Sequence, residues 1–191
     1  MKDTSQRILD AAIRVFARDG VSGATTREIA RAARVNEVTL FRHFKNKDEL
    51  LRQVVLSCSK RYENIFTEAL FATPADLRRT VQAFASGYAR MLLENEDFVR
   101  TFFGELNRHL KLCRSLFVDS GKPARQKFID YLRAAQKARL VRRNIDVTLA
   151  ADALTGMLLS GVIRRPLTEG TYTNEDYVKT CVELFLKGIE P

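Results

Sequence analysis

The sequence predicts an all-α protein, and three observations support this fold class. Nearly every segment of the 191 residues carries apolar side chains at helical spacing. No segment shows the sustained alternation of apolar and polar residues that marks a half-buried strand. Helix-capping Thr and Asn residues and helix-ending Gly and Pro residues separate the apolar segments. We therefore expect about nine helices, divided between a domain over residues 1–50 and a second domain over residues 51–191.

Two short helices are predicted at the start of the first domain. The first, over about residues 3–19, carries one apolar stripe and is followed by Gly20, which can adopt the left-handed conformation that ends a helix. The second opens with a capping box, in which Thr25 accepts from a free backbone N–H while Glu28 reaches back, and it ends near Arg34.

A third helix is predicted after Asn36, which is a good N-cap. Its Leu40 and Phe44 lie four residues apart on one face and can pack onto the first two helices, closing a small core. With that face turned inward, the opposite face presents Val38 and Arg42 and is small and basic.

The arrangement from residue 25 to residue 51 is typical of a helix-turn-helix, in which the second helix lies in the major groove of DNA. Thr and Arg side chains can contact base edges or phosphates, so Thr39 and Arg42 are the leading contacts. Lys47, at the start of a fourth helix, can hold a phosphate together with the free N–H groups of that helix. The predicted DNA-binding residues are Thr26, Arg27, Asn36, Glu37, Val38, Thr39, Phe41, Arg42, His43, Lys45 and Lys47.

The remaining helices belong to the second domain, and the boundary is expected along the fourth helix. That helix begins at residues 47–51, and Thr73-Pro74 supply an N-cap and a first-turn proline for a fifth. Further helices are expected over about 95–114, 122–141, 146–165 and 174–189, separated by residues 120–123, Asn144, Pro166 and Gly170.

Composition narrows the class of protein. A formal net charge of +9 favours an anionic partner such as nucleic acid. The three cysteines, Cys58, Cys113 and Cys181, are far apart and form no CxxC pair, so we expect neither a disulfide framework nor a zinc site. The longest uncharged stretch falls short of the roughly 18 residues that a membrane span requires. The first residues do not open a signal peptide, and we expect a soluble, cytoplasmic protein.

Residues 29–44, followed by residues 47–51, resemble the DNA-binding signature of TetR-like bacterial regulators. The resemblance covers most of residues 5–55. It implies an N-terminal three-helix domain that binds DNA, a helical body that binds a ligand, and a homodimer built from the last two helices. It also implies repression at a pseudo-palindromic double-stranded operator, relieved by a small-molecule effector. An activator, a nonspecific DNA-binding protein and a helical interaction protein that does not bind DNA remain alternatives.

Three positions depart from the signature. Arg34 stands where the family commonly has a glycine with positive φ, so the turn is expected to be strained. Phe41 replaces a tyrosine whose hydroxyl meets phosphate, and Glu37 replaces a frequent lysine. We therefore expect an operator preference different from that of other members.

Aromatic side chains are frequent in the central segments of the second domain, and they could line a pocket for an apolar or aromatic effector. Ordinary core packing is the alternative for each of them. His109 could offer the effector a polar group. With two histidines in the chain and no thiolate pair near His43, we expect no metal. The predicted ligand-binding residues are Phe66, Phe84, Tyr88, Met91, Phe102, Phe103, Leu106, His109 and Phe128.

The last two predicted helices carry small and apolar residues that suit a symmetric four-helix interface between two copies of the chain. The alternative is that both helices complete the core of a monomer. The predicted interface residues are Ala153, Gly156, Met157, Ser160, Tyr177, Val178, Cys181 and Phe185. The sequence contains no GxSxG, GxGxxG, P-loop or HExxH motif, so we expect neither an enzyme nor a cofactor.

Overall fold

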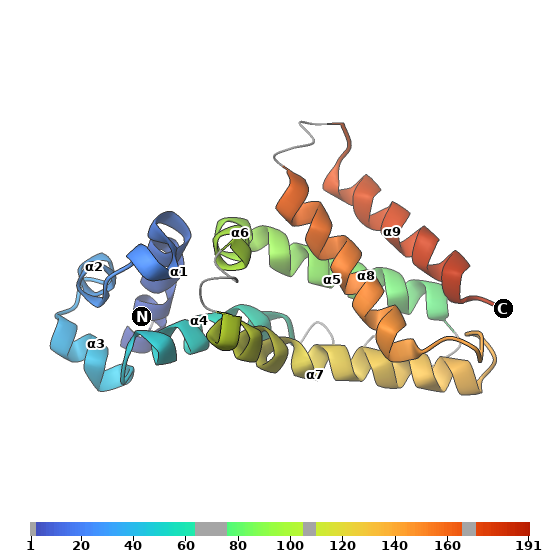
Figure 1. The fold of residues 1–191 in the computed structure, drawn as a ribbon, viewed down its shortest axis with the longest axis horizontal. Helices are drawn as coiled ribbons and strands as arrows, with labels where there is room; N and C mark the ends of the chain where they lie inside the picture. Colours follow the sequence, from blue (N-terminus) through green and yellow to red (C-terminus); the bar gives the residue numbers. More distant parts are fainter. Residues whose placement is uncertain (1–2, 64–75, 105–109, 166–170) are drawn as a thin grey trace. The chain divides into compact units, whose positions relative to one another are not determined.

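The computed structural model describes residues 3–63, 76–104, 110–165 and 171–191, with side chains except at 59, 61–63 and 110–122. Within these ranges the chain forms nine helices and no strand, which confirms the predicted fold class (Figure 1). The helices are α1 Thr4–Gly23, α2 Thr26–Ala32, α3 Glu37–His43, α4 Lys47–Glu63, α5 Leu77–Glu94, α6 Glu96–Gly104, α7 Leu110–Lys137, α8 Val147–Arg164 and α9 Asn174–Ile189.

The chain divides into two compact units. The N-terminal unit contains Met1–Arg61 and Asn95–Ser120, and the C-terminal unit contains Tyr62–Glu94 and Gly121–Pro191. Helices α4 and α6 therefore belong with α1, α2 and α3, although the sequence pattern assigned residues from 51 onward to the second domain.

Helix α1 is the centre of the N-terminal unit. Ile8, Ala12 and Phe16 are completely buried along its inner face, as the apolar stripe predicts. Gly20 has φ 74°, but it kinks the helix instead of ending it, and one more turn continues as far as Gly23. Helix α6 packs on α1, where the Thr101 hydroxyl donates to the Ala17 carbonyl at 3.0 Å.

Helix caps fix most of the boundaries. The predicted capping box between Thr25 and Glu28 opens α2, and the Asn36 side chain accepts from the Thr39 N–H at the start of α3. A second capping box, between Thr173 and Asp176, opens α9. The predicted Thr73-Pro74 cap lies outside the described residues.

The predicted break at residues 120–123 is wrong, because α7 continues through Pro123. A proline inside a helix removes one hydrogen bond and costs about 3 kcal/mol. Downstream of it, Phe128 and Leu132 are completely buried. Burying each such side chain contributes roughly 1.5–3 kcal/mol, so tertiary packing offsets the proline.

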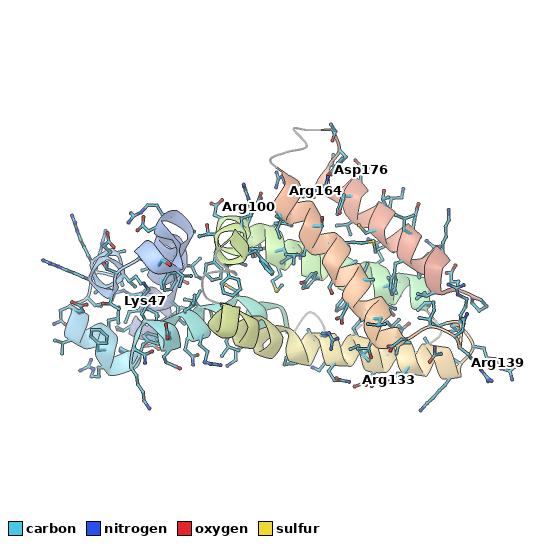
Figure 2. All side chains as sticks on the ribbon, viewed as in Figure 1. Lys47, Arg100, Arg133, Arg139, Arg164 and Asp176 are labelled. Atoms are coloured by element: carbon cyan, nitrogen blue, oxygen red, sulfur yellow. The ribbon has the colours of Figure 1, made fainter. Side chains whose placement is uncertain are left out.

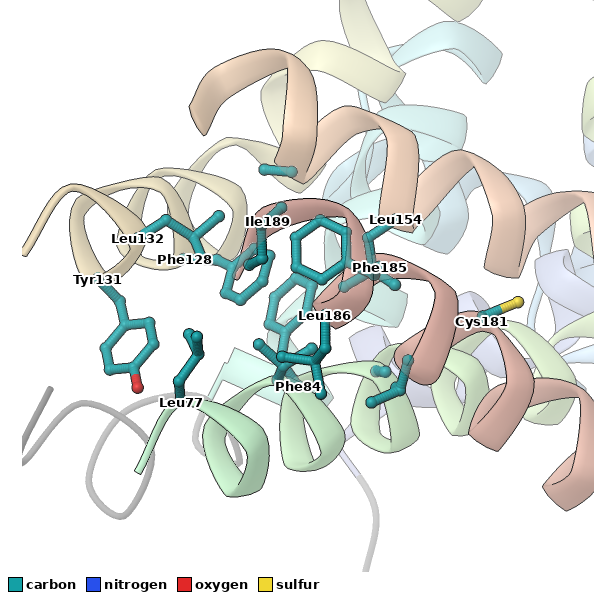
Figure 3. Packing of buried hydrophobic residues seen from close by; sticks show 14 of the residues in the cluster. Leu77, Phe84, Phe128, Tyr131, Leu132, Leu154, Cys181, Phe185, Leu186 and Ile189 are labelled. Atoms are coloured by element: carbon teal, nitrogen blue, oxygen red, sulfur yellow. The ribbon is translucent and has the colours of Figure 1, made fainter. Parts of the chain in front are cut away.

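The core of the C-terminal unit gathers side chains from α5, α7, α8 and α9 (Figure 3). Phe84 of α5 stacks on Phe128 of α7 with ring centroids 3.9 Å apart. The ring centroids of Phe185 of α9 and Phe128 lie 6.3 Å apart. Leu154 of α8 is completely buried in the same cluster.

Candidate nucleic-acid interface

Helices α2 and α3 form a helix-turn-helix supported by the core of the N-terminal unit. Ile29 of α2 and Leu40 of α3 are completely buried, and Phe44 is the buried C-cap residue of α3. The predicted inward face of α3 is therefore confirmed at both positions. Because this face is held by packing, the opposite face is presented to solvent in a fixed orientation.

The outward face of α3 combines apolar and basic side chains. Val38 is 78% exposed and Phe41 is 45% exposed, although both are apolar. Arg42, His43 and Lys45 are exposed on the same helix or directly after it. A thymine methyl group suits the valine, and guanine or phosphate suits the arginine. The structure thus leaves these five predicted residues accessible to a partner, on α3 and directly after it.

Two predicted DNA-binding residues contact each other. The Thr26 hydroxyl donates to the Glu37 carboxylate at 2.5 Å, which joins the first turn of α2 to the first turn of α3. Glu37 therefore has an intramolecular role, and its negative charge lies at the N-terminus of α3, where the helix dipole favours an acid.

Two further predicted DNA-binding residues, Asn36 and Thr39, hydrogen-bond to each other at the start of α3. The Thr39 hydroxyl donates to the Asn36 side-chain oxygen at 2.7 Å, and that oxygen also accepts from the Thr39 N–H at 2.7 Å. Arg27, the second residue of α2, is exposed and available to a phosphate.

Lys47, at the start of α4, lies among the N-terminal helices (Figure 2). Its ammonium donates to the carbonyls of Ala24 at 2.6 Å and Ser22 at 3.3 Å. Two of its three protons are therefore used to hold the segment between α1 and α2. The residue predicted to clamp a phosphate also supports the fold.

The turn between α2 and α3 contains a residue with positive φ at position 34, where the family commonly has glycine and this chain has arginine. Arg34 has φ 55°. The Val35 N–H donates to the Ala30 carbonyl at 3.0 Å, and the Arg34 N–H donates to the Arg31 carbonyl at 3.1 Å. This pair of hydrogen bonds defines a Schellman motif, in which the left-handed position usually holds glycine.

The predicted ligand-binding residues fall into three sets. Phe84, Tyr88, Met91 and Phe128 lie in or against the core of the C-terminal unit, where Phe84 and Tyr88 stack at 6.3 Å. Burial raises the pKa of the Tyr88 phenol to about 12. Phe102 and Phe103 pack instead in the N-terminal unit with α1. The predicted residues Phe66, Leu106 and His109 lie outside the described residues.

The predicted interface residues fall into two groups, one buried in the core of the chain and one exposed or half-buried. Val178, Cys181 and Phe185 of α9 are buried in the core of their own chain, because the apolar stripe of α9 turns inward. Ala153 and Gly156 of α8 are exposed, and Met157, Ser160 and Tyr177 are half-buried.

The close approach of α8 and α9 within the chain occurs at Gly161, which sequence reasoning did not select. A Cβ there would clash with the Tyr177 ring, whereas a Cβ at Gly156 would meet nothing within 4 Å. The Tyr177 hydroxyl donates to the Met157 carbonyl at 2.9 Å. The spacing of Ala153, Gly156 and Ser160 indicated a helix-packing face, but of the two glycines of α8 it is Gly161 that lies against α9.

The fold and this surface define a class, the helix-turn-helix DNA-binding regulators. The family profile described as "Bacterial regulatory proteins, tetR family" matches residues 8–54, and that of the "AefR-like transcriptional repressor, C-terminal domain" matches residues 75–188. The chain belongs to the TetR family of transcriptional regulators, whose members bind operator DNA and small effectors and are not enzymes.

Some relatives match nearly the whole length of the chain. It is 26% identical to the HTH-type transcriptional regulator YvkB of Bacillus subtilis, over 99% of this chain and 98% of that protein. The fatty acid degradation regulator FadR from Bacillus halodurans has the same fold, with a TM-score of 0.81 and 19% identity over 97% of this chain and 96% of that one. FadR from Bacillus subtilis, solved in complex with stearoyl-CoA, gives a TM-score of 0.77 and 20% identity, over 97% and 99% of the two chains.

Proposed function

We propose that the chain is a cytoplasmic repressor that binds a pseudo-palindromic operator as a homodimer and is released by a small, apolar or aromatic effector. The observation that carries DNA recognition is the outward face of α3, where Val38 and Phe41 are exposed beside Arg42. Exposed apolar side chains cost free energy in water, so their position next to a guanidinium favours a partner with both apolar and polar groups. The edges of bases in the major groove provide both.

Selection of bound genomic fragments by the purified protein tests this proposal. We expect one palindromic site to be enriched by the intact chain and lost in the variant Arg42→Ala, with Val38→Asp as a second loss. Arg90→Ala, an exposed arginine on α5 in the C-terminal unit, is the control of equal charge change. No enrichment by the intact chain at about 0.1 M salt would contradict sequence-specific binding.

The homodimer rests on the composition of α8. One face of this helix, including Leu154 and Leu158, is buried in the core of the C-terminal unit. Yet Leu149 is 67% exposed, Ile163 is 37% exposed, and Gly156 has open space around it. Among the described residues, α8 is also the one helix long and apolar enough to cross a membrane. A helix with one face in its own core and an apolar face left exposed suits packing against a second copy.

Sedimentation and operator binding test the dimer. Gly156→Arg places a charge on the exposed face without a clash inside the chain, so we expect monomers that keep their helical content and lose operator affinity. Ala83→Arg, on an exposed position of α5, is the control and should remain dimeric. A dimeric Gly156→Arg protein would exclude this face as the interface.

The effector class rests on the aromatic stack of the C-terminal unit. Phe84, Tyr88 and Phe128 provide apolar surface, and the half-buried Tyr88 adds a phenol hydroxyl to it. Stearoyl-CoA, which the Bacillus subtilis FadR structure contains, is the first compound to test, with a flavonoid as the aromatic comparison. We expect one of them to release the operator fragment, less effectively with Tyr88→Phe. Release by neither would reject both classes.

A further inference from the structure

The turn that sets the angle between α2 and α3 is built with a residue that disfavours it. The left-handed region is unfavourable for an L-residue other than glycine, and Arg34 adopts φ 55° there. Because α3 carries the proposed DNA-reading face, a change in this turn would move Val38 and Arg42 with respect to the groove. Something in the N-terminal unit must therefore hold the turn.

Arg7, near the start of α1, contacts this turn. Its Nη2 donates to the Ala33 carbonyl at 2.7 Å and to the Arg34 carbonyl at 3.2 Å. These two carbonyls belong to the C-cap residue of α2 and to the left-handed residue itself. A cation at the C-terminus of a helix also interacts favourably with the helix dipole. The Schellman hydrogen bonds satisfy the carbonyls of Ala30 and Arg31, and the guanidinium satisfies the carbonyls of the C-cap and left-handed residues.

Arg7 is fixed on the opposite side by the core. It directly precedes Ile8 and Leu9, which are buried in the cluster that also contains Ala30 and Ala33. The guanidinium therefore joins α1 to Ala33 and Arg34, which lie 26 and 27 residues further along the chain. A change in the turn would break both hydrogen bonds.

We propose that Arg7 is a positioning residue for DNA recognition: it holds Arg34 in the left-handed conformation and so sets the orientation of α3. This inference rests on the proposed operator binding, but the state of the turn can be measured without DNA. The role depends on the arginine at position 34, since a glycine there would adopt the same conformation without help.

A double-mutant cycle of Arg7→Ala and Arg34→Gly tests the proposal. Two readouts are used: affinity for a duplex carrying the enriched operator site, at fixed salt, and hydrogen exchange of the Val35 amide in the free protein. We expect Arg7→Ala alone to weaken operator binding about tenfold and to speed hydrogen exchange of the Val35 amide by a similar factor. Both changes are of the size expected for the loss of one charge-assisted hydrogen bond. In the Arg34→Gly background, the same substitution should change both by about threefold or less.

The rescue by glycine separates positioning from direct contact. If Arg7 instead binds phosphate, Arg34→Gly will not restore affinity, Val35 exchange will be unchanged, and the salt dependence will fall by about one phosphate contact. That result overturns the proposal. If the intact chain selects no operator, the proposed function fails while the exchange measurement still decides whether Arg7 holds the turn. Unchanged Val35 exchange in Arg7→Ala would overturn the inference on its own.

Discussion

The two units of this protein each contain a helix that ends on a left-handed arginine. In the N-terminal unit α2 ends before Arg34, with φ 55°, and in the C-terminal unit α7 ends before Arg139, with φ 62°. At the second turn the Leu140 N–H donates to the Ala135 carbonyl at 2.9 Å, and the Arg139 N–H donates to the Gln136 carbonyl at 3.2 Å. Both turns are therefore Schellman motifs with arginine where glycine is usual.

The two turns differ in the contacts that hold them. The turn at Arg34 is held by Arg7 of α1, which lies 26 residues before Ala33 and 27 before Arg34. In the segment after Arg139, at the end of α7 (Figure 2), the Gln136 amide donates to the carbonyls of Arg142 at 2.8 Å and Ile145 at 2.9 Å. Arg142 also bonds to α9: its backbone N–H donates to the Ile189 carbonyl at 2.8 Å, and its guanidinium donates to the Gly188 carbonyl. In the N-terminal unit a guanidinium from α1 thus contacts the carbonyls of the motif itself, whereas in the C-terminal unit the tertiary contacts with α9 fall on the segment that follows the motif.

The helices that begin after the two turns also differ in their caps. Helix α3 is capped by the neutral side chain of Asn36, and α8 by the carboxylate of Asp146. A neutral cap avoids placing a second anion, next to Glu37, beside the phosphates that α3 would approach, whereas α8 has no such constraint in the proposed function.

The largest expected effect comes from placing a β-branched residue at either left-handed position. Arg34→Val and Arg139→Val should each destabilise the protein by about 2 kcal/mol, because valine fits the left-handed region poorly. Only Arg34→Val should also abolish operator binding. Urea denaturation and operator titration measure the two effects. Unchanged midpoints of urea denaturation in both variants would contradict the left-handed conformation of Arg34 and Arg139.

Exchanging the cap chemistry is the next test of the comparison. Asn36→Asp should weaken operator binding at least about tenfold through repulsion of phosphate, at unchanged folding stability, because Asn and Asp are equally good N-caps. Asp146→Asn should leave operator affinity as it is. Equal effects of the two exchanges would show that the cap of α3 does not face the DNA backbone.

Substituting glycine at the same two positions should raise folding stability, whereas valine lowers it. Arg34→Gly and Arg139→Gly relieve the left-handed strain but add backbone entropy to the unfolded chain, so each should stabilise by about 0.5 kcal/mol. Thermal unfolding of both variants checks this expectation. A gain at Arg139 with a loss at Arg34 would mean that the arginine side chain itself contributes at the first turn.

The smallest expected effect is a difference in acid sensitivity. The N–H groups of Thr148 and Leu149 donate to Asp146 and lower the pKa of its carboxyl. Its contribution to stability is therefore complete above the unfolded pKa of about 3.9 and is lost as the pH falls through the lower folded value. Asp146→Asn keeps a capping oxygen but does not titrate, so its unfolding should depend less on pH between roughly pH 5 and pH 3. An identical pH profile in variant and parent would contradict this role.

Local sequence patterns predicted the caps and the helix-turn-helix well. Thr25, Glu28 and Asn36 act through atoms within three residues, so their chemistry is readable from spacing alone. The inward positions of Leu40 and Phe44 are set by helical periodicity in the same way. The break at Pro123 failed because distant packing of Phe128 outweighs a local penalty.

The sequence by itself determined the all-α class, the caps and the composition of the recognition surface, since these depend on propensities and hydrogen bonds within one or two helical turns. Tertiary structure alone decided that α6 packs on α1, that the apolar stripe of α9 turns inward and that the Tyr177 ring lies against Gly161. It also decided that Arg7 reaches the turn at Arg34. Each of these contacts joins residues far apart in the chain, and their partners are chosen by packing of the whole unit, which no local pattern contains.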